Sequence, residues 1–87
     1  DPVRYLHLGK GAVARTDEIV GIFDLDITSQ SHLTRKYLAA CEKAGQVENA
    51  AEDIPKSFVV LEGSGKRRLV LSQMNTATLL KRVKSGE

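Results

Sequence analysis

The segment that most constrains the fold of this chain is the run Ile19–Asp24, which reads Ile-Val-Gly-Ile-Phe-Asp. A short run that is almost entirely apolar and rich in β-branched residues is typical of a strand covered on both faces. Gly21 weakens a strand, so we expect a helix, a neighbouring backbone or another subunit to pass close to it. The run therefore predicts the middle strand of a small sheet.

Further apolar or alternating runs, each bounded by turn residues, predict the other strands of the sheet. We expect these strands at 3–8, 12–15, 47–50, 56–61 and 67–72. Gly9-Lys10-Gly11 makes the first tight turn, and Gly63-Ser64-Gly65-Lys66 makes a hairpin turn between the last two strands. The segment 47–50 is mixed in character and predicts only a weak edge strand.

Two segments with helical periodicity predict helices that cover the sheet. In 32–44 the apolar stripe consists of Leu33, Tyr37, Ala40, Cys41 and Ala44, with Leu38 widening it. Ser29 or Ser31 can cap this helix, and Gly45 suits its C-terminal end. In 76–84 the expected buried side is Leu79, Leu80 and Val83, with Asn75 as the N-cap.

The sum of these elements predicts an α+β domain over residues 1–87, with the strand and helix order βββαβββα. Tight turns join antiparallel strands, so we expect one mainly antiparallel sheet of about five to six strands with two helices packed on it. Two helices cover one face of such a sheet. The other face and the edge strands would stay exposed in a monomer, which predicts a homo-oligomer.

The composition is typical of a small globular domain and does not indicate a reaction. The chain has 87 residues, 41% hydrophobic and 28% charged, and a net charge of +2. Residues 1–63 carry seven Lys and Arg against ten Asp and Glu, and residues 64–87 carry six against one. This asymmetry fits either an anionic partner or a solubilising surface, and cations in the last turn of the final helix already complement its dipole.

Several features bear on the compartment and on the ends of the chain. No segment approaches the ~20 apolar residues of a membrane span, and no signal-peptide pattern opens the chain. The chain begins at Asp1 rather than Met, so we expect residues 1–3 to be a remnant of processing. Cys41 has no second cysteine to pair with and is expected as a small buried hydrophobe in a reducing cytoplasm.

No catalytic constellation is present in the sequence, so we expect no enzyme, no cofactor, no small-molecule substrate and no metal. Asp24-x-Asp26 has two carboxylates but no third oxygen ligand at loop spacing, which favours a solvated strand exit over a cation site. Gly63-Ser64-Gly65-Lys66 resembles the end of a P-loop. That motif needs Gly at position 60 and Ser or Thr at 67, where this chain has Val60 and Arg67, so we reject it.

Five segments, in order and with compatible spacing, resemble the RemA/RemB family of bacterial regulators of extracellular-matrix and biofilm genes, and most closely its RemB branch. They are Tyr5–Gly9, Glu18–Asp24, Pro55–Val60, Leu71–Gln73 and Thr78–Arg82. The resemblance spans residues 5–83. It implies a cytoplasmic, nucleoid-associated protein that binds double-stranded DNA as a ring-shaped homo-oligomer, through backbone contacts that depend on salt and on DNA curvature.

The chain departs from this family at the residues that the family uses for DNA. Where RemA-type members place arginines, this chain has Glu18 and Asp53-Ile54, so those contacts do not carry over. The resemblance leaves Arg15, Lys56, Arg35, Lys36 and Arg67 as the candidate DNA-binding residues, the last within a basic hairpin finger with Lys66 and Arg68. Arg35 and Lys36 fit a phosphate contact or an ordinary solvated helix face. The rival hypothesis is an oligomeric protein-interaction module that binds a paralogue or a regulator and no nucleic acid.

Overall fold

The computed structural model describes residues 3–28 and 31–85, and it has an α+β architecture with six strands in two sheets. The strands are β1 (Tyr5–Gly9), β2 (Ala12–Arg15), β3 (Ile19–Asp24), β4 (Val47–Asn49), β5 (Ser57–Gly63) and β6 (Lys66–Ser72). The helices are α1 (Leu25–Thr28), α2 (His32–Lys43) and α3 (Thr76–Ser85), and a 3₁₀ turn, Thr16–Glu18, precedes β3. The positions of the predicted strands and of the two long helices agree with these elements to within two residues.

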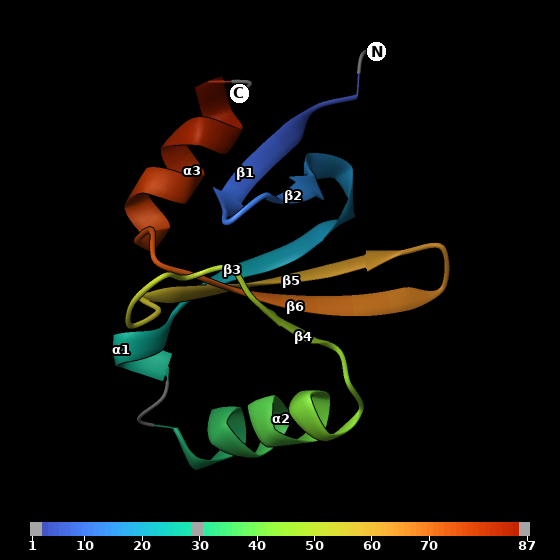
Figure 1. Ribbon diagram of the computed structural model, residues 1–87, viewed down its shortest axis with the longest axis vertical. Helices are drawn as coiled ribbons and strands as arrows, with labels where there is room; N and C mark the ends of the chain where they lie inside the picture. Colours follow the sequence, from blue (N-terminus) through green and yellow to red (C-terminus); the bar gives the residue numbers. More distant parts are fainter. Residues whose placement is uncertain (1–2, 29–30, 86–87) are drawn as a thin grey trace.

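The layers are arranged differently from the prediction of one sheet with two helices on one face. A four-stranded sheet, in the order β3-β5-β6-β4, lies in the middle of the molecule, and β1 and β2 form a separate two-stranded hairpin. In Figure 1 the hairpin and α3 lie on one side of the four-stranded sheet, and α2 lies on the other. The prediction of a single five- to six-stranded sheet was wrong because β1 and β2 pair only with each other.

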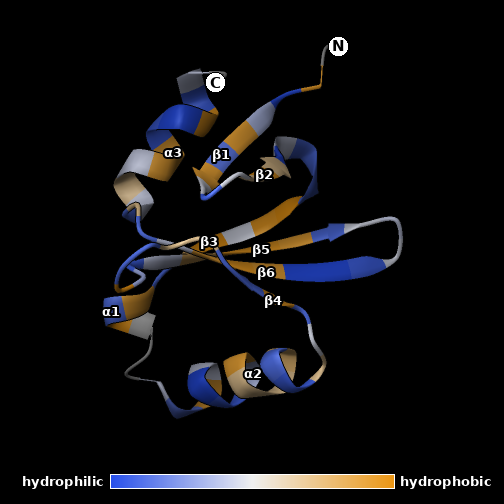
Figure 2. Cartoon of the chain, in the orientation of Figure 1, coloured by the Kyte–Doolittle hydropathy of each residue, from blue (hydrophilic) through white to orange (hydrophobic). Residues whose placement is uncertain are grey.

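Two hydrophobic cores follow from this arrangement, one on each face of the sheet. Val59 and Leu61 of β5 point to the side of the hairpin and α3, whereas Phe58 and Val60 point to α2. A strand that is buried on both faces reads as a continuous apolar run, and in this protein that strand is β5 rather than β3. Figure 2 shows apolar residues gathered on β1, β3 and β5.

Strand β3, the predicted middle strand, lies at an edge of the sheet. It pairs antiparallel with β5 alone, and Val20 keeps 64% of its surface exposed. A bulge between Ile19 and Gly21 shifts the strand register at Val20. The residue that passes close to Gly21 is Phe23 of the same strand, whose ring stacks on Phe58 with centroids 4.9 Å apart. An apolar run thus occupies an exposed edge, where natural sheets usually place charges.

The two long helices begin at the predicted caps. The Ser31 hydroxyl accepts a hydrogen bond from the Thr34 N–H at 3.4 Å, and the Asn75 side chain accepts one from the Thr78 N–H at 2.8 Å. Ser29, the other predicted cap, lies outside the described residues. Gly45 has the positive φ, 72°, that a residue just after a helix end often requires.

The buried stripes of the helices differ from the predicted ones. In α2 the side chains that pack on the sheet are Tyr37, Leu38 and Cys41, while Leu33 is 76% exposed. In α3 Leu79 is fully buried, but its neighbour Leu80, which we predicted to be buried, is 47% exposed. A narrower stripe than predicted suffices for α3 because Leu6, Leu8 and Ala14 of the hairpin cover the same face of the sheet.

Gly9, at the end of β1, makes a backbone contact that no other residue would allow. Its φ is +124°, and an added Cβ would lie 2.5 Å from the Ala50 carbonyl oxygen. We predict that Gly9→Ala lowers the free energy of unfolding by roughly 2–4 kcal/mol, through backbone strain and this clash. Gly11, with φ +77° and open space around it, is the matched control, and Gly11→Ala should cost only roughly 1–2 kcal/mol. Equal losses in urea denaturation would refute the role of the Ala50 contact.

Candidate nucleic-acid interface

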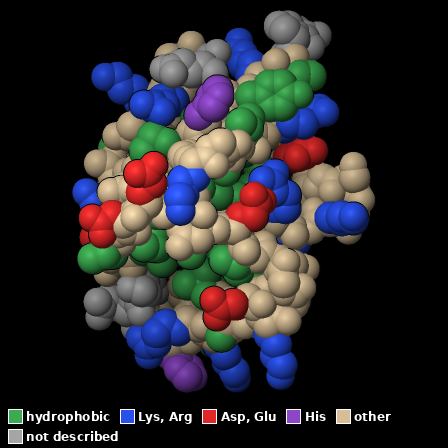
Figure 3. Space-filling view, viewed as in Figure 1, with side chains coloured by type: hydrophobic (Ala, Val, Ile, Leu, Met, Phe, Trp, Pro, Cys, Tyr) green, Lys and Arg blue, Asp and Glu red, His purple; other side chains and the backbone are tan. Residues whose placement is uncertain are grey.

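Of the described helices and strands, α2 carries the largest number of exposed Lys and Arg side chains, Arg35, Lys36 and Lys43. We call the set that contains them the outer face of α2: His32, Arg35, Lys36, Ala39, Ala40 and Lys43, all exposed. The helical period places His32, Lys36, Ala39 and Lys43 opposite Cys41, the buried residue of the helix, and Arg35 and Ala40 at the borders of this face. Figure 3 shows Lys and Arg side chains projecting from the end of the molecule that α2 forms.

The local chemistry of α2 leaves much of this positive charge available. Lys36 and Lys43 form no ion pair with any residue that the structure describes. The first turn of the helix contains no acidic residue that would complement its dipole or neutralise Lys36. Ala39 and Ala40 are short and leave a flat surface between the cations. The face can therefore approach a polyanion closely and contact it at several points.

Arg15, another predicted DNA-binding residue, is already paired with acidic neighbours. Its Nε and Nη2 atoms donate to the two carboxylate oxygens of Asp17 at 3.1 and 2.8 Å, and Glu18 Oε2 lies 3.9 Å from Nε. The hydrogen bond to Asp17 raises the pKa of Arg15 and lowers the pKa of Asp17. The charge that Arg15 offers to a phosphate is therefore largely cancelled by two carboxylates.

The Arg15–Asp17 pair should make the stability of the fold depend on pH. Because the folded-state pKa of Asp17 is lowered, the pair stabilises the fold at neutral pH, and this contribution is lost as the pH falls through the lowered pKa. We predict that Arg15→Gln returns the pKa of Asp17 toward its ordinary value, measured by an NMR titration of the side-chain carboxyl. An unchanged Asp17 pKa in the variant would show that Arg15 is not its partner in solution.

Lys56 is exposed, but the structure does not bring it next to Arg15. In the antiparallel β3–β5 pair, Ile19 lies opposite Leu61 and Asp24 opposite Ser57. Arg15 comes just before the 3₁₀ turn that leads into β3, and Lys56 just before the start of β5, so they lie at opposite ends of this pair. Four to five residues of strand separate them, roughly 15 Å or more. The two residues do not form one site within one copy of the chain.

The β5–β6 hairpin does not present three free cations, as a basic finger would. Its turn, Ser64-Gly65, has φ values of 53° and 74°, the geometry of a type I′ turn rather than a phosphate loop. Arg67 forms an ion pair with Glu62, and its Nη1 donates to the Tyr37 hydroxyl at 3.2 Å. Arg68, on the opposite face of β6, pairs with Glu48 of β4 at 2.6 Å.

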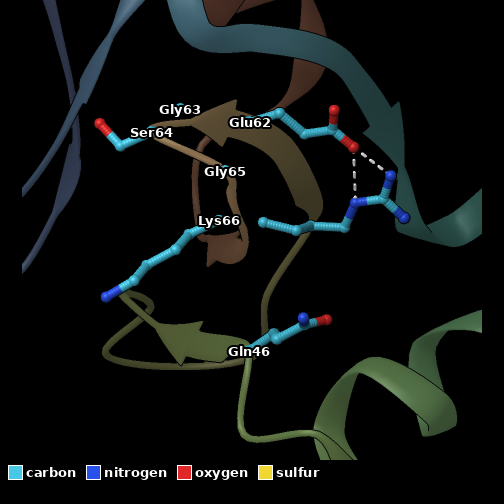
Figure 4. Close-up of a pocket in the computed structure, with 7 residues that line it drawn as sticks. Gln46, Glu62, Gly63, Ser64, Gly65 and Lys66 are labelled. Atoms are coloured by element: carbon cyan, nitrogen blue, oxygen red, sulfur yellow. Dashed lines mark hydrogen bonds and ion pairs between the residues drawn. The ribbon is translucent and has the colours of Figure 1, made fainter.

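A polar cavity of about 520 Å³ lies beside this hairpin, between its tip and the residues that follow α2. It is lined by Gln46 and by the hairpin residues 62–67. Figure 4 shows the Glu62 carboxylate bonded at one side of the cavity and the Lys66 side chain extending away from it. Arg67 and Arg68 are each paired with a glutamate, whereas Lys66 forms no ion pair with a described residue.

An apolar groove runs under the exposed edge of the sheet, between β3 and α2. We call it the β3 groove; its volume is about 310 Å³ and its lining residues are Val20, Phe23, Leu33, Thr34, Tyr37, Phe58, Val60 and Arg67. Burial raises the pKa of the Tyr37 phenol, and the Arg67 guanidinium lies 5.9 Å from its ring centroid. We did not predict this groove from the sequence, because the groove exists only if β3 is an edge strand of the sheet.

Asp24 takes part in the fold as a helix cap. Its Oδ1 accepts hydrogen bonds from the backbone N–H groups of Asp26 and Ile27, at 2.8 and 3.2 Å, and so caps α1. We did not predict α1, which replaces the expected strand exit. Among the described residues, no group of three His, Cys, Asp or Glu side chains is placed to hold a metal ion.

Comparisons with known proteins give no match: no protein-family model fits the chain, and no curated protein matches its sequence. Within residues 3–28 and 31–85, no helix combines the length and the apolarity that crossing a bilayer demands.

Proposed function

We propose that this chain is a non-enzymatic DNA-binding regulator of extracellular-matrix genes that acts in the bacterial cytoplasm as a ring-shaped homo-oligomer. The observation that carries the proposal is the outer face of α2, where Lys36 and Lys43 are exposed and unpaired among the described residues. Arg35 lies on the same face. Two parts of the proposal, the target genes and the ring-shaped oligomer, come from the resemblance to the RemA/RemB family. That resemblance rests only on the five sequence segments.

The geometry favours backbone contact over base readout. Lysines act as point charges toward phosphate, and α2 offers no exposed Asn or Gln that would read adenine. One helix presents few cations, but an oligomer repeats the face once per subunit, so that modest single contacts add up on one duplex. DNA curvature would then decide how many subunits touch phosphate at once.

A comparison of duplex lengths tests this proposal. A duplex of about 60 base pairs should bind at least tenfold tighter than one of about 12 base pairs, because only the longer duplex engages several subunits. Fluorescence anisotropy at low salt measures both affinities, and light scattering of the free protein measures the assembly. Equal affinity for the two lengths, or a monomeric protein, would refute the proposal.

A second candidate function is an oligomeric protein-interaction module that binds no nucleic acid. It is favoured by the acidic side chains at the positions where RemA-type members have arginines, and by the ion pairs that occupy Arg15, Arg67 and Arg68. In that case light scattering would show an assembly, and neither duplex would bind.

A further inference from the structure

Ile54 is the most exposed large hydrophobic side chain of the described residues, with 78% of its surface accessible. It lies in the loop between β4 and β5, directly after the exposed acidic residues Glu52 and Asp53. A single exposed Ile is common on protein surfaces and needs no explanation by itself. Ile54, however, protrudes from a loop that hydrogen bonds hold in place.

Hydrogen bonds on both sides of Ile54 fix the loop. The Glu52 N–H donates to the Gln73 side chain at 3.2 Å, and the Ile54 N–H donates to the Asp53 carboxylate at 2.9 Å. The Lys56 N–H donates to the Ser72 carbonyl at 2.8 Å, and Pro55 restricts the backbone between them. Because the loop backbone is already ordered, the loop loses little conformational entropy when a partner binds the Ile54 side chain.

The β3 groove has the complementary properties. It is apolar and open, with Val20 and Leu33 at 64% and 76% exposure. One unpaired cation borders it: Lys36 lies one helical turn from Leu33 on α2, whereas the lining residue Arg67 is already paired with Glu62. An apolar side chain that follows two carboxylates fits an apolar groove bordered by a cation.

We propose that Ile54 of one copy of this chain seats in the β3 groove of a second copy, with Glu52 and Asp53 facing Lys36. Ile54 does not line the groove of its own subunit, and its loop leaves from β4, the edge of the sheet opposite β3. We place the contact head to tail, so that each copy offers Ile54 to one neighbour and its groove to another; such a heterologous contact closes a ring or extends a filament.

This contact rests on the oligomer of the proposed function and deepens it by naming the partner surface. It also fits the DNA contact. Lys43 and the two alanines of the outer face of α2 are not among the residues that line the groove. A ring joined through Ile54 and the β3 groove therefore places Lys36 at the border of the contact and keeps Lys43 available to DNA.

Two charge-introducing variants and their mixture test the contact. Ile54→Glu removes the apolar side chain, and Leu33→Glu places a carboxylate at the groove; both sites are exposed, so the variants should fold, which circular dichroism verifies. Each variant alone should self-associate about 30-fold or more weakly than the original chain. An equimolar mixture should form dimers, because one variant retains its groove and the other retains Ile54.

Light scattering separates the outcomes. Leu80→Glu, at an exposed Leu on α3, is the matched control and should assemble like the original chain. If the original chain assembles and Ile54→Glu assembles equally well, or if the mixture stays monomeric, the contact is refuted while the oligomer stands. If the original chain is itself a monomer, the oligomeric part of the proposed function falls together with the contact.

Discussion

Reversing two charges on α2, in the variant Lys36→Glu/Lys43→Glu, is expected to weaken DNA binding by at least about 100-fold at ~50 mM salt. Each lysine that neutralises a phosphate releases counterions from the duplex, and the loss is multiplied by the number of subunits on the same DNA. A glutamate in its place also repels the backbone. Fluorescence anisotropy with a long duplex measures the change.

The matched control for this variant is Lys81→Glu/Lys84→Glu on α3. It changes the net charge by the same amount, and both lysines are exposed, but α3 lies on the other side of the sheet from α2. We expect this control to lose only a few-fold in affinity, through the weaker long-range field. Equal losses in the two variants would mean that DNA responds to net charge and not to the outer face of α2.

Leu79→Ala is expected to be the most destabilising single substitution proposed for this protein. Leu79 is fully buried in the core between α3, the hairpin and the four-stranded sheet. Its truncation leaves a cavity that costs roughly 2–5 kcal/mol, a large part of the ~5–15 kcal/mol that holds a domain of this size together. The melting temperature should fall by about 10 °C or more.

Leu80→Ala is the internal control for that measurement, because it removes the same atoms from the next residue of the same helix. Leu80 is 47% exposed, so its truncation should cost less than about 1 kcal/mol. Thermal unfolding followed by circular dichroism gives both values. If Leu80→Ala costs as much as Leu79→Ala, α3 is rotated relative to the structure described here.

Local signals in the sequence predicted the positions of the elements well. Turn residues such as Ser64-Gly65 and capping residues such as Ser31 and Asn75 act within a few residues, so the sequence around them is sufficient. Strand neighbours are a different matter. The run Ile19–Asp24 is as apolar as a middle strand, but its place at the edge depends on pairing with residues about forty positions away.

The candidate site shows the same division. The exposure of Arg35 and Lys36 follows from helical periodicity, and the structure agrees. The neutralisation of Arg15 could have been inferred from Asp17 two residues later, whereas the pairing of Arg68 with Glu48 links parallel strands that no local pattern connects. The sequence did not predict the β3 groove either. The groove requires the edge position of β3 and an orientation of α2 about its axis that exposes Leu33.

The salt dependence of DNA binding tests the central claim most directly. Anisotropy titrations of a duplex of about 60 base pairs, at about 50 and 200 mM salt, compare the affinities of the unmodified chain. If repeated lysines of α2 contact phosphate from several subunits, the affinity should fall roughly a thousandfold or more between the two salt concentrations. No binding at the lower salt concentration, or an affinity that does not change with salt, would contradict this account.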